Sequence, residues 1–109
     1  MNIVKIKLEY GCFPVWIYSE NNKLIENDLP SYLIGDDEID PIFVHIQQIY
    51  DSLYLNDEKE FKYIGFKNEE TKNTFKKELS NAIDLLKSKL SSEYKFEENS
   101  ASLTKYLGD

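Results

Sequence analysis

The chain has 109 residues, 41% of them hydrophobic, and a formal net charge of -7. That length is typical of one domain, so the sequence predicts a single compact unit over residues 1–109, and the hydrophobic content disfavours disorder except at the ends of the chain. One cysteine excludes an internal disulfide, and no apolar run approaches the ~20 residues of a membrane-spanning helix, so we expect a cytoplasmic protein with no membrane role.

The negative charge is concentrated in one part of the chain. No basic residue lies between Lys23 and Lys59, whereas nine of the 20 acidic residues do. The 13 basic residues are all lysines, which lack the planar two-pronged group that arginine offers to phosphate. This distribution disfavours direct binding of nucleic acid.

The first 26 residues predict three strands. Asn2–Tyr10 alternates, with Val4, Ile6, Leu8 and Tyr10 on one side and charged residues on the other, as in a strand buried on one face. Gly11–Pro14 interrupts this pattern, and Val15–Tyr18 resumes it as an antiparallel partner. Asn21-Asn22 indicates a turn, and Lys23–Glu26 indicates a short third strand.

A helix occupies the middle of the predicted fold. Asp28–Gly35 indicates a loop with one helical turn, and Asp36–Leu55 has the period of an amphipathic helix. Its apolar arc contains Ile39, Ile42, Phe43, Ile46, Ile49, Tyr50 and Leu53. Asp40 is the predicted N-cap, because Pro41 suits the first helical position, and we expect the sequence from Asn56 onward to end the helix.

The rest of the chain alternates strands and helices. Glu60–Phe66 has apolar residues on both sides, which predicts an interior strand. Asn68 is the predicted cap of a second helix that ends near Leu90, with Phe75, Leu79, Ala82, Ile83, Leu86 and Leu90 as its buried stripe. Glu93–Glu97 indicates an edge strand, and Ser100 is expected to cap a short helix that ends before Gly108.

This order of elements predicts an α+β fold. We expect a mainly antiparallel sheet of four to five strands, covered on one side by two main helices and a short C-terminal helix.

The residue types needed for common catalytic and cofactor sites are scarce. Zinc sites recruit several cysteines or histidines, and this chain has one of each; His45, at the border of the apolar arc, is interpreted as a boundary residue. Asp36, Glu38 and Asp40 have the spacing of the first calcium-loop ligands, but Pro41 stands where that loop needs glycine. We therefore expect no enzyme, no cofactor, no metal and no small-molecule ligand.

The lysine-free interval is the best candidate for a binding surface. Its like charges repel one another in the folded state, a cost that a basic partner would relieve, and Tyr32, Val44 and Leu55 supply apolar contacts among them. The predicted partner-binding residues lie around both ends of the central helix: Asp36, Asp37, Glu38, Asp51, Tyr54, Asp57, Glu58 and Glu60.

The sequence resembles a known class of bacterial proteins. The resemblance lies in Lys5–Gly11 (KIKLEYG), Pro14–Tyr18 (PVWIY), Asp28–Pro30 (DLP), Ile49–Leu53 (IYDSL) and the strand and long helix that follow. In these segments the chain looks like the small immunity proteins of contact-dependent growth inhibition and related polymorphic toxin systems. The resemblance implies a cytoplasmic protein that binds one cognate toxin, often a nuclease, and occludes its active site or substrate path.

Two other functions are consistent with the same residues. The first is a non-enzymatic adaptor or regulatory protein-binding domain, and the second is a small enzyme that carries no familiar motif. Gene order separates the first from an immunity protein, because an immunity gene directly follows its toxin gene.

Overall fold

The computed structural model describes residues 1–97. Its elements are β1 (Asn2–Ile6), β2 (Val15–Tyr18), β3 (Leu24–Glu26), a 3-10 turn (Ser31–Leu33), α1 (Ile39–Ser52), β4 (Tyr54–Asn56), β5 (Phe61–Tyr63), α2 (Glu69–Lys89) and β6 (Tyr94–Glu97). The predicted terminal helix from Ser100 to Gly108 lies outside the described residues.

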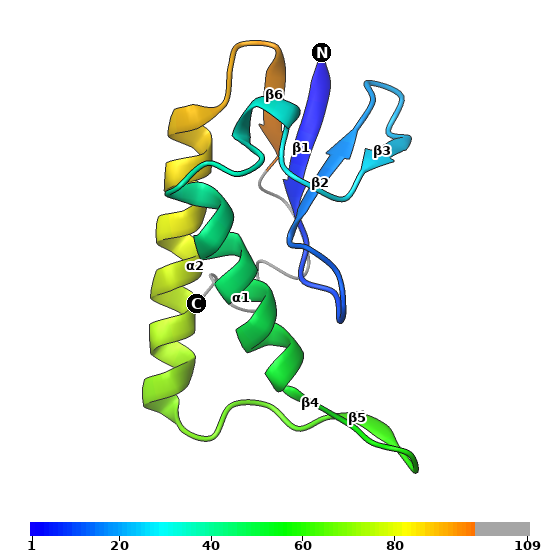
Figure 1. The fold of residues 1–109 in the computed structure, drawn as a ribbon, viewed down its shortest axis with the longest axis vertical. Helices are drawn as coiled ribbons and strands as arrows, with labels where there is room; N and C mark the ends of the chain where they lie inside the picture. Colours follow the sequence, from blue (N-terminus) through cyan, green and yellow to red (C-terminus); the bar gives the residue numbers. More distant parts are fainter. Residues whose placement is uncertain (98–109) are drawn as a thin grey trace.

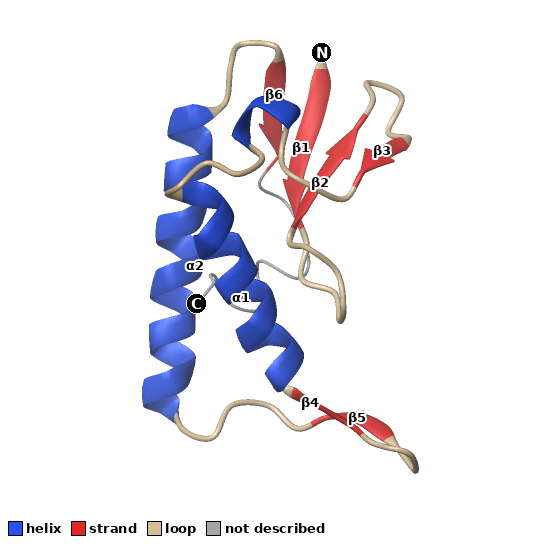
Figure 2. Ribbon diagram, viewed as in Figure 1, coloured by secondary structure: helices blue, strands red, loops and turns tan. Residues whose placement is uncertain are grey.

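The predicted α+β class is confirmed. Four strands form one sheet in the order β3-β2-β1-β6, and β4 and β5 form a separate two-stranded sheet (Figures 1 and 2). β2 runs antiparallel to both β1 and β3, whereas β6 runs parallel to β1. The larger sheet is therefore mixed, and β6 lies at its edge as expected.

One face of the larger sheet packs against both helices. Val4 and Ile6 of β1 and Ile17 of β2 join Phe43 of α1 and Leu79 of α2 in a single buried cluster. Alternation in the first strand thus separates core from surface as far as Leu8, which is also buried. Tyr10 was expected on the same buried side but is partly exposed, because β1 ends at Ile6 and the chain then turns towards the small sheet.

The start of α1 differs from the prediction. The helix begins at Ile39, two residues before Pro41, and Asp36 caps it: its Oδ1 accepts the backbone N–H groups of Glu38 and Ile39 at 2.9 and 3.0 Å. Asp40, the predicted N-cap, instead accepts the N–H of Gly35 through Oδ2 at 2.7 Å. Gly35 has a φ of 79°, so the chain can fold back far enough for Asp36 to reach the helix.

The end of α1 differs as well. The helix stops at Ser52, and Tyr54–Asn56 pairs with Phe61–Tyr63 as a hairpin. Its turn forms because Asp57 Oδ1 accepts the N–H groups of Lys59 and Glu60 at 2.8 and 2.9 Å. The interior strand predicted at Glu60–Phe66 is wrong: β5 pairs with β4, outside the larger sheet, and its side chains are exposed.

α2 agrees closely with its prediction. Asn68 Oδ1 accepts the N–H of Thr71 at 2.9 Å and caps the helix, and the expected apolar stripe is buried from Phe75 to Leu86. The two helices lie against each other, and the hairpin arm extends from the C-terminal end of α1 (Figure 1).

Candidate functional site

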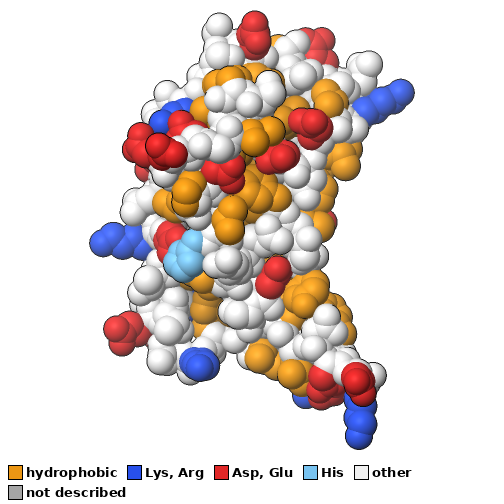
Figure 3. Space-filling view, viewed as in Figure 1, with side chains coloured by type: hydrophobic (Ala, Val, Ile, Leu, Met, Phe, Trp, Pro, Cys, Tyr) orange, Lys and Arg blue, Asp and Glu red, His pale blue; other side chains and the backbone are white. Residues whose placement is uncertain are grey.

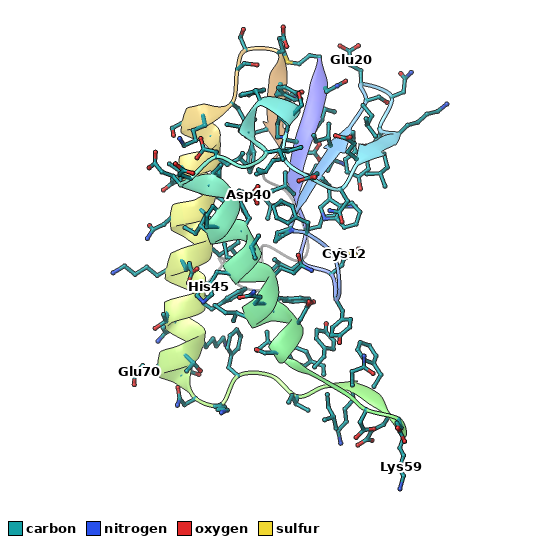
Figure 4. All side chains as sticks on the ribbon, viewed as in Figure 1. Cys12, Glu20, Asp40, His45, Lys59 and Glu70 are labelled. Atoms are coloured by element: carbon teal, nitrogen blue, oxygen red, sulfur yellow. The ribbon has the colours of Figure 1, made fainter. Side chains whose placement is uncertain are left out.

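The eight predicted contact residues do not form one patch. Asp36, Asp37 and Glu38 precede α1, whereas the other five lie at or beyond its last turn: Asp51, Tyr54, Asp57, Glu58 and Glu60. A 14-residue helix is about 21 Å long at 1.5 Å per residue. Figure 4 shows the resulting separation, with Asp40 near the start of α1 and Lys59 at the far tip of the hairpin.

The negative charge of Asp36, Asp37 and Glu38 at the start of α1 is partly neutralised by a lysine of α2. Lys89 Nζ lies 3.3 Å from Asp36 Oδ2 and 3.3 Å from Glu38 Oε1. The backbone N–H groups of Ile39 and Glu38, with help from Lys89, hold the pKa of Asp36 below its ordinary value. In turn, the hydrogen bonds to Glu38 and Asp36 raise the pKa of Lys89. One lysine therefore balances part of this group, and Asp37 stays exposed.

A shallow hollow of about 440 Å³ lies beside these carboxylates. It is lined by Gly35, Asp36, Asp37, Asp40, Pro41, Val44, His45 and Gln48. Val44 is exposed, as are Tyr32 and Ile34 just before α1. In Figure 3, acidic side chains gather over the start of α1 and hydrophobic side chains lie next to them on the same face. We call this surface, defined by those eight lining residues and the adjacent Glu38, the acidic hollow.

His45 joins the two helices at the border of the acidic hollow. Its Nδ1 lies 2.5 Å from Oε1 of Glu78 on α2. Although this histidine points to the surface (Figure 4), its contact is with the partner helix. The boundary role expected from the sequence is consistent with this geometry.

The second acidic group is mostly engaged in local structure. Asp51 Oδ1 accepts the N–H of Gly11 at 2.9 Å and fastens the β1–β2 loop to the end of α1. Asp57 holds the hairpin turn, and Oε1 of Glu60 lies 3.5 Å from Nζ of Lys62. Glu58 is exposed. The composition of the segment could not distinguish carboxylates that hold the fold from those directed at solvent.

Aromatic rings gather on and beside the hairpin, and among them the sequence predicted only Tyr54 as a partner-binding residue. Tyr54 lies at its centre, with ring centroids 5.3 Å from Tyr10 and Phe61, 5.2 Å from Tyr63 and 5.4 Å from Tyr50. Tyr10 also meets Phe61 edge to face at 4.8 Å. Burial and the 2.8 Å hydrogen bond to Tyr54 raise the pKa of Tyr50, so that its hydroxyl keeps its proton. We call these five residues the aromatic ladder.

An apolar groove of about 530 Å³ runs between the end of α1 and the start of α2. Its lining includes three hydroxyl groups, and each donates to a helix carbonyl: Ser52 to Ile49, Thr71 to Asn68 and Thr74 to Glu70. These three hydroxyl groups therefore stabilise the backbone of the helix ends that line the groove.

Residues 1–97 show no cluster of three or more side chains that could hold a metal ion. None of the helices in this described part is long and apolar enough to cross a membrane.

Fold and surface together define a small α+β protein with an acidic hollow and an aromatic hairpin. No protein-family model matches the chain, and no curated protein matches it.

Proposed function

We propose that this protein is an immunity protein that acts in the cytoplasm. It binds a cognate toxin domain, a basic nuclease, and occludes the active site or the path of the substrate without catalysing a reaction. The resemblance in the sequence suggests this class, and one observation about the surface supports the mode of binding: carboxylates line the acidic hollow together with the exposed side chain of Val44.

The arrangement of the carboxylates favours a charged partner. Backbone N–H groups hold Asp36 and Asp40 in place, so these side chains lose little conformational freedom when a cation binds. Asp37 and Glu38 are exposed and extend the negative field into solvent. Such a surface attracts a basic protein at long range and speeds association at low salt.

The apolar side chains around the hollow supply contact area. Tyr32, Ile34 and Val44 are exposed large hydrophobic residues close to the carboxylates in sequence. Aromatic and aliphatic anchors surrounded by charge are typical of tight protein interfaces, in which a few buried side chains carry most of the binding energy.

The test uses the product of the gene immediately upstream as the candidate toxin. We expect the two proteins to copurify at one to one, and we expect added immunity protein to abolish the nuclease activity stoichiometrically. Binding without loss of activity would favour the adaptor function. Absence of a complex with that protein would contradict the proposal.

Two charge reversals test the docking surface. The pair Asp37→Lys and Glu38→Lys leaves the cap residue Asp36 in place, and we expect it to slow association at least tenfold at low salt. The matched control is Asp84→Lys with Glu93→Lys, which changes the charge equally at exposed sites outside the hollow. Equal association rates for the two pairs would rule out the acidic hollow as the docking surface.

A further inference from the structure

The β4–β5 hairpin projects from the body of the molecule. It is the lowest feature of Figure 1, and its two strands pair with each other rather than with the larger sheet. A two-stranded hairpin has little stability of its own in water. Here the aromatic ladder supports it, since Tyr10 reaches it from the β1–β2 loop and the hydroxyl of Tyr10 accepts a hydrogen bond from Nδ2 of the Asn56 side chain at 3.2 Å.

Much of the apolar surface of this arm faces solvent. Phe61 is 54% exposed and Tyr63 43%, and Tyr10, which packs on them from the β1–β2 loop through the aromatic ladder, is 38% exposed. Apolar surface that remains exposed to solvent adds little to the free energy of folding. A contiguous exposed apolar patch commonly marks an interaction site.

Carboxylates outnumber lysines around the ladder. Glu9 precedes Tyr10, Asp51 follows Tyr50, and three more carboxylates lie in or beside the turn: Asp57, Glu58 and Glu60. Lys59 and Lys62 are the lysines of the hairpin, and Lys62 contacts Glu60. The hairpin surface is thus negative overall as well as aromatic.

We propose that the hairpin binds arginine side chains of the basic partner. A guanidinium group is planar and weakly hydrated, so it stacks on a tyrosine or phenylalanine ring while its N–H groups bond a carboxylate. The exposed ring of Phe61 and the exposed carboxylates of Glu58 and Glu60 lie in the same short hairpin, which therefore offers both kinds of contact. This inference rests on the proposed function, because it identifies the chemistry of the same partner.

The hairpin and the acidic hollow are close enough to serve one partner. They flank α1, which is about 21 Å long, and Figure 3 shows acidic side chains at both ends of the same face. A standard interface buries about 800 Å² on each protein, which corresponds to a patch roughly 30 Å across. The strands of the hairpin add about 10 Å beyond the helix, so one basic protein that covers both surfaces needs an interface at or above this standard size.

The experiment is a titration of the full chain with a hexa-arginine peptide, followed by NMR. We expect shifts in the ring signals of Tyr10 and Phe61 and in the amides of residues 57–62. We also expect hexalysine to bind at least threefold more weakly, because an ammonium group is more strongly hydrated than guanidinium and has no planar face to stack on a ring. Hairpin shifts that change with protein concentration before peptide is added would assign the surface to a second copy of the chain and overturn the inference.

Variants separate the hairpin from general acidity. Phe61→Ser should weaken the peptide at least fivefold, whereas the matched control Leu24→Ser, at an equally exposed residue of β3, should leave affinity unchanged. Glu58→Lys provides a second test if Phe61→Ser loosens the hairpin, since Asp57 rather than Glu58 holds the turn. Wild-type affinity in Glu58→Lys and in a folded Phe61→Ser would overturn the inference.

The position of the shifts distinguishes the two proposals. Shifts confined to residues 35–48 would overturn the role of the hairpin and leave the acidic hollow as the docking surface. Shifts confined to the hairpin would support the inference and contradict docking at the hollow. Absence of shifts at both surfaces would overturn both.

Discussion

Phe43 and Phe61 form a matched pair for testing whether the hairpin rings serve stability or binding. Phe43 on α1 is fully buried, with its ring 6.2 Å from that of Phe13, whereas Phe61 is more than half exposed. Replacing each by alanine removes the same atoms from opposite environments. If burial decides stability, the two variants must differ widely in their free energy of unfolding.

The size of the difference follows from the two environments. A fully buried phenylalanine costs about 3–5 kcal/mol when truncated to alanine, through lost burial and the cavity that remains. In a domain of this size, 1 kcal/mol moves the melting temperature by roughly 4 °C, so Phe43→Ala should melt about 12–20 °C lower. Phe61→Ala loses ring contacts with Tyr10 and Tyr54 in an arm that can fray locally, and we expect about 1 kcal/mol.

The assay is thermal and urea unfolding followed by circular dichroism. The expected result is a loss of midpoint at least three times larger for Phe43→Ala than for Phe61→Ala. Similar losses for the two variants would refute the reasoning, because Phe61 would then belong to the cooperative core and its exposure would not point to a partner.

Two further predictions concern helix capping. Asn68→Ala should cost about 1 kcal/mol of unfolding free energy in urea titration, whereas Asn68→Asp should keep the cap and most of that stability; equal losses would contradict the assignment. The pKa of Asp36 is lower in the folded protein than its ordinary value of 3.8, so the ionised carboxylate stabilises the folded state. This stabilisation is fully present above pH 3.8 and is lost as the pH falls through the lower pKa of the folded protein. The slope of stability against pH below about pH 4 should therefore flatten in Asp36→Asn, and an unchanged slope would contradict this reading.

Local patterns predicted the elements whose partners lie close by in sequence. β1 and β2 follow from alternation on either side of a short loop, and their register keeps Val4 and Ile17 on the buried face. The cap at Asn68 and the buried stripe of α2 follow from a helix that is long enough for its period to be clear. Each of these features depends on neighbouring residues, which the sequence presents directly.

The β4–β5 hairpin could not be predicted from local patterns in the sequence. Tyr54 and Leu55 continue the apolar content of α1, and the apolar residues on both sides of β5 are typical of an interior strand. Two contacts separate this segment from the helix: the turn held by Asp57, and the contact of the Tyr54 ring with that of Tyr10, which lies 44 positions earlier in the chain. A contact of that range cannot be inferred from local periodicity.

The candidate site also has features that the sequence predicts and features that depend on the tertiary structure. The sequence by itself determined where the negative charge lies along the chain and that a fold of α+β class would carry it. Only the tertiary structure decided which carboxylates hold the fold and which face solvent, because Lys89 reaches Asp36, and Gly11 reaches Asp51, across distances in sequence that folding alone closes.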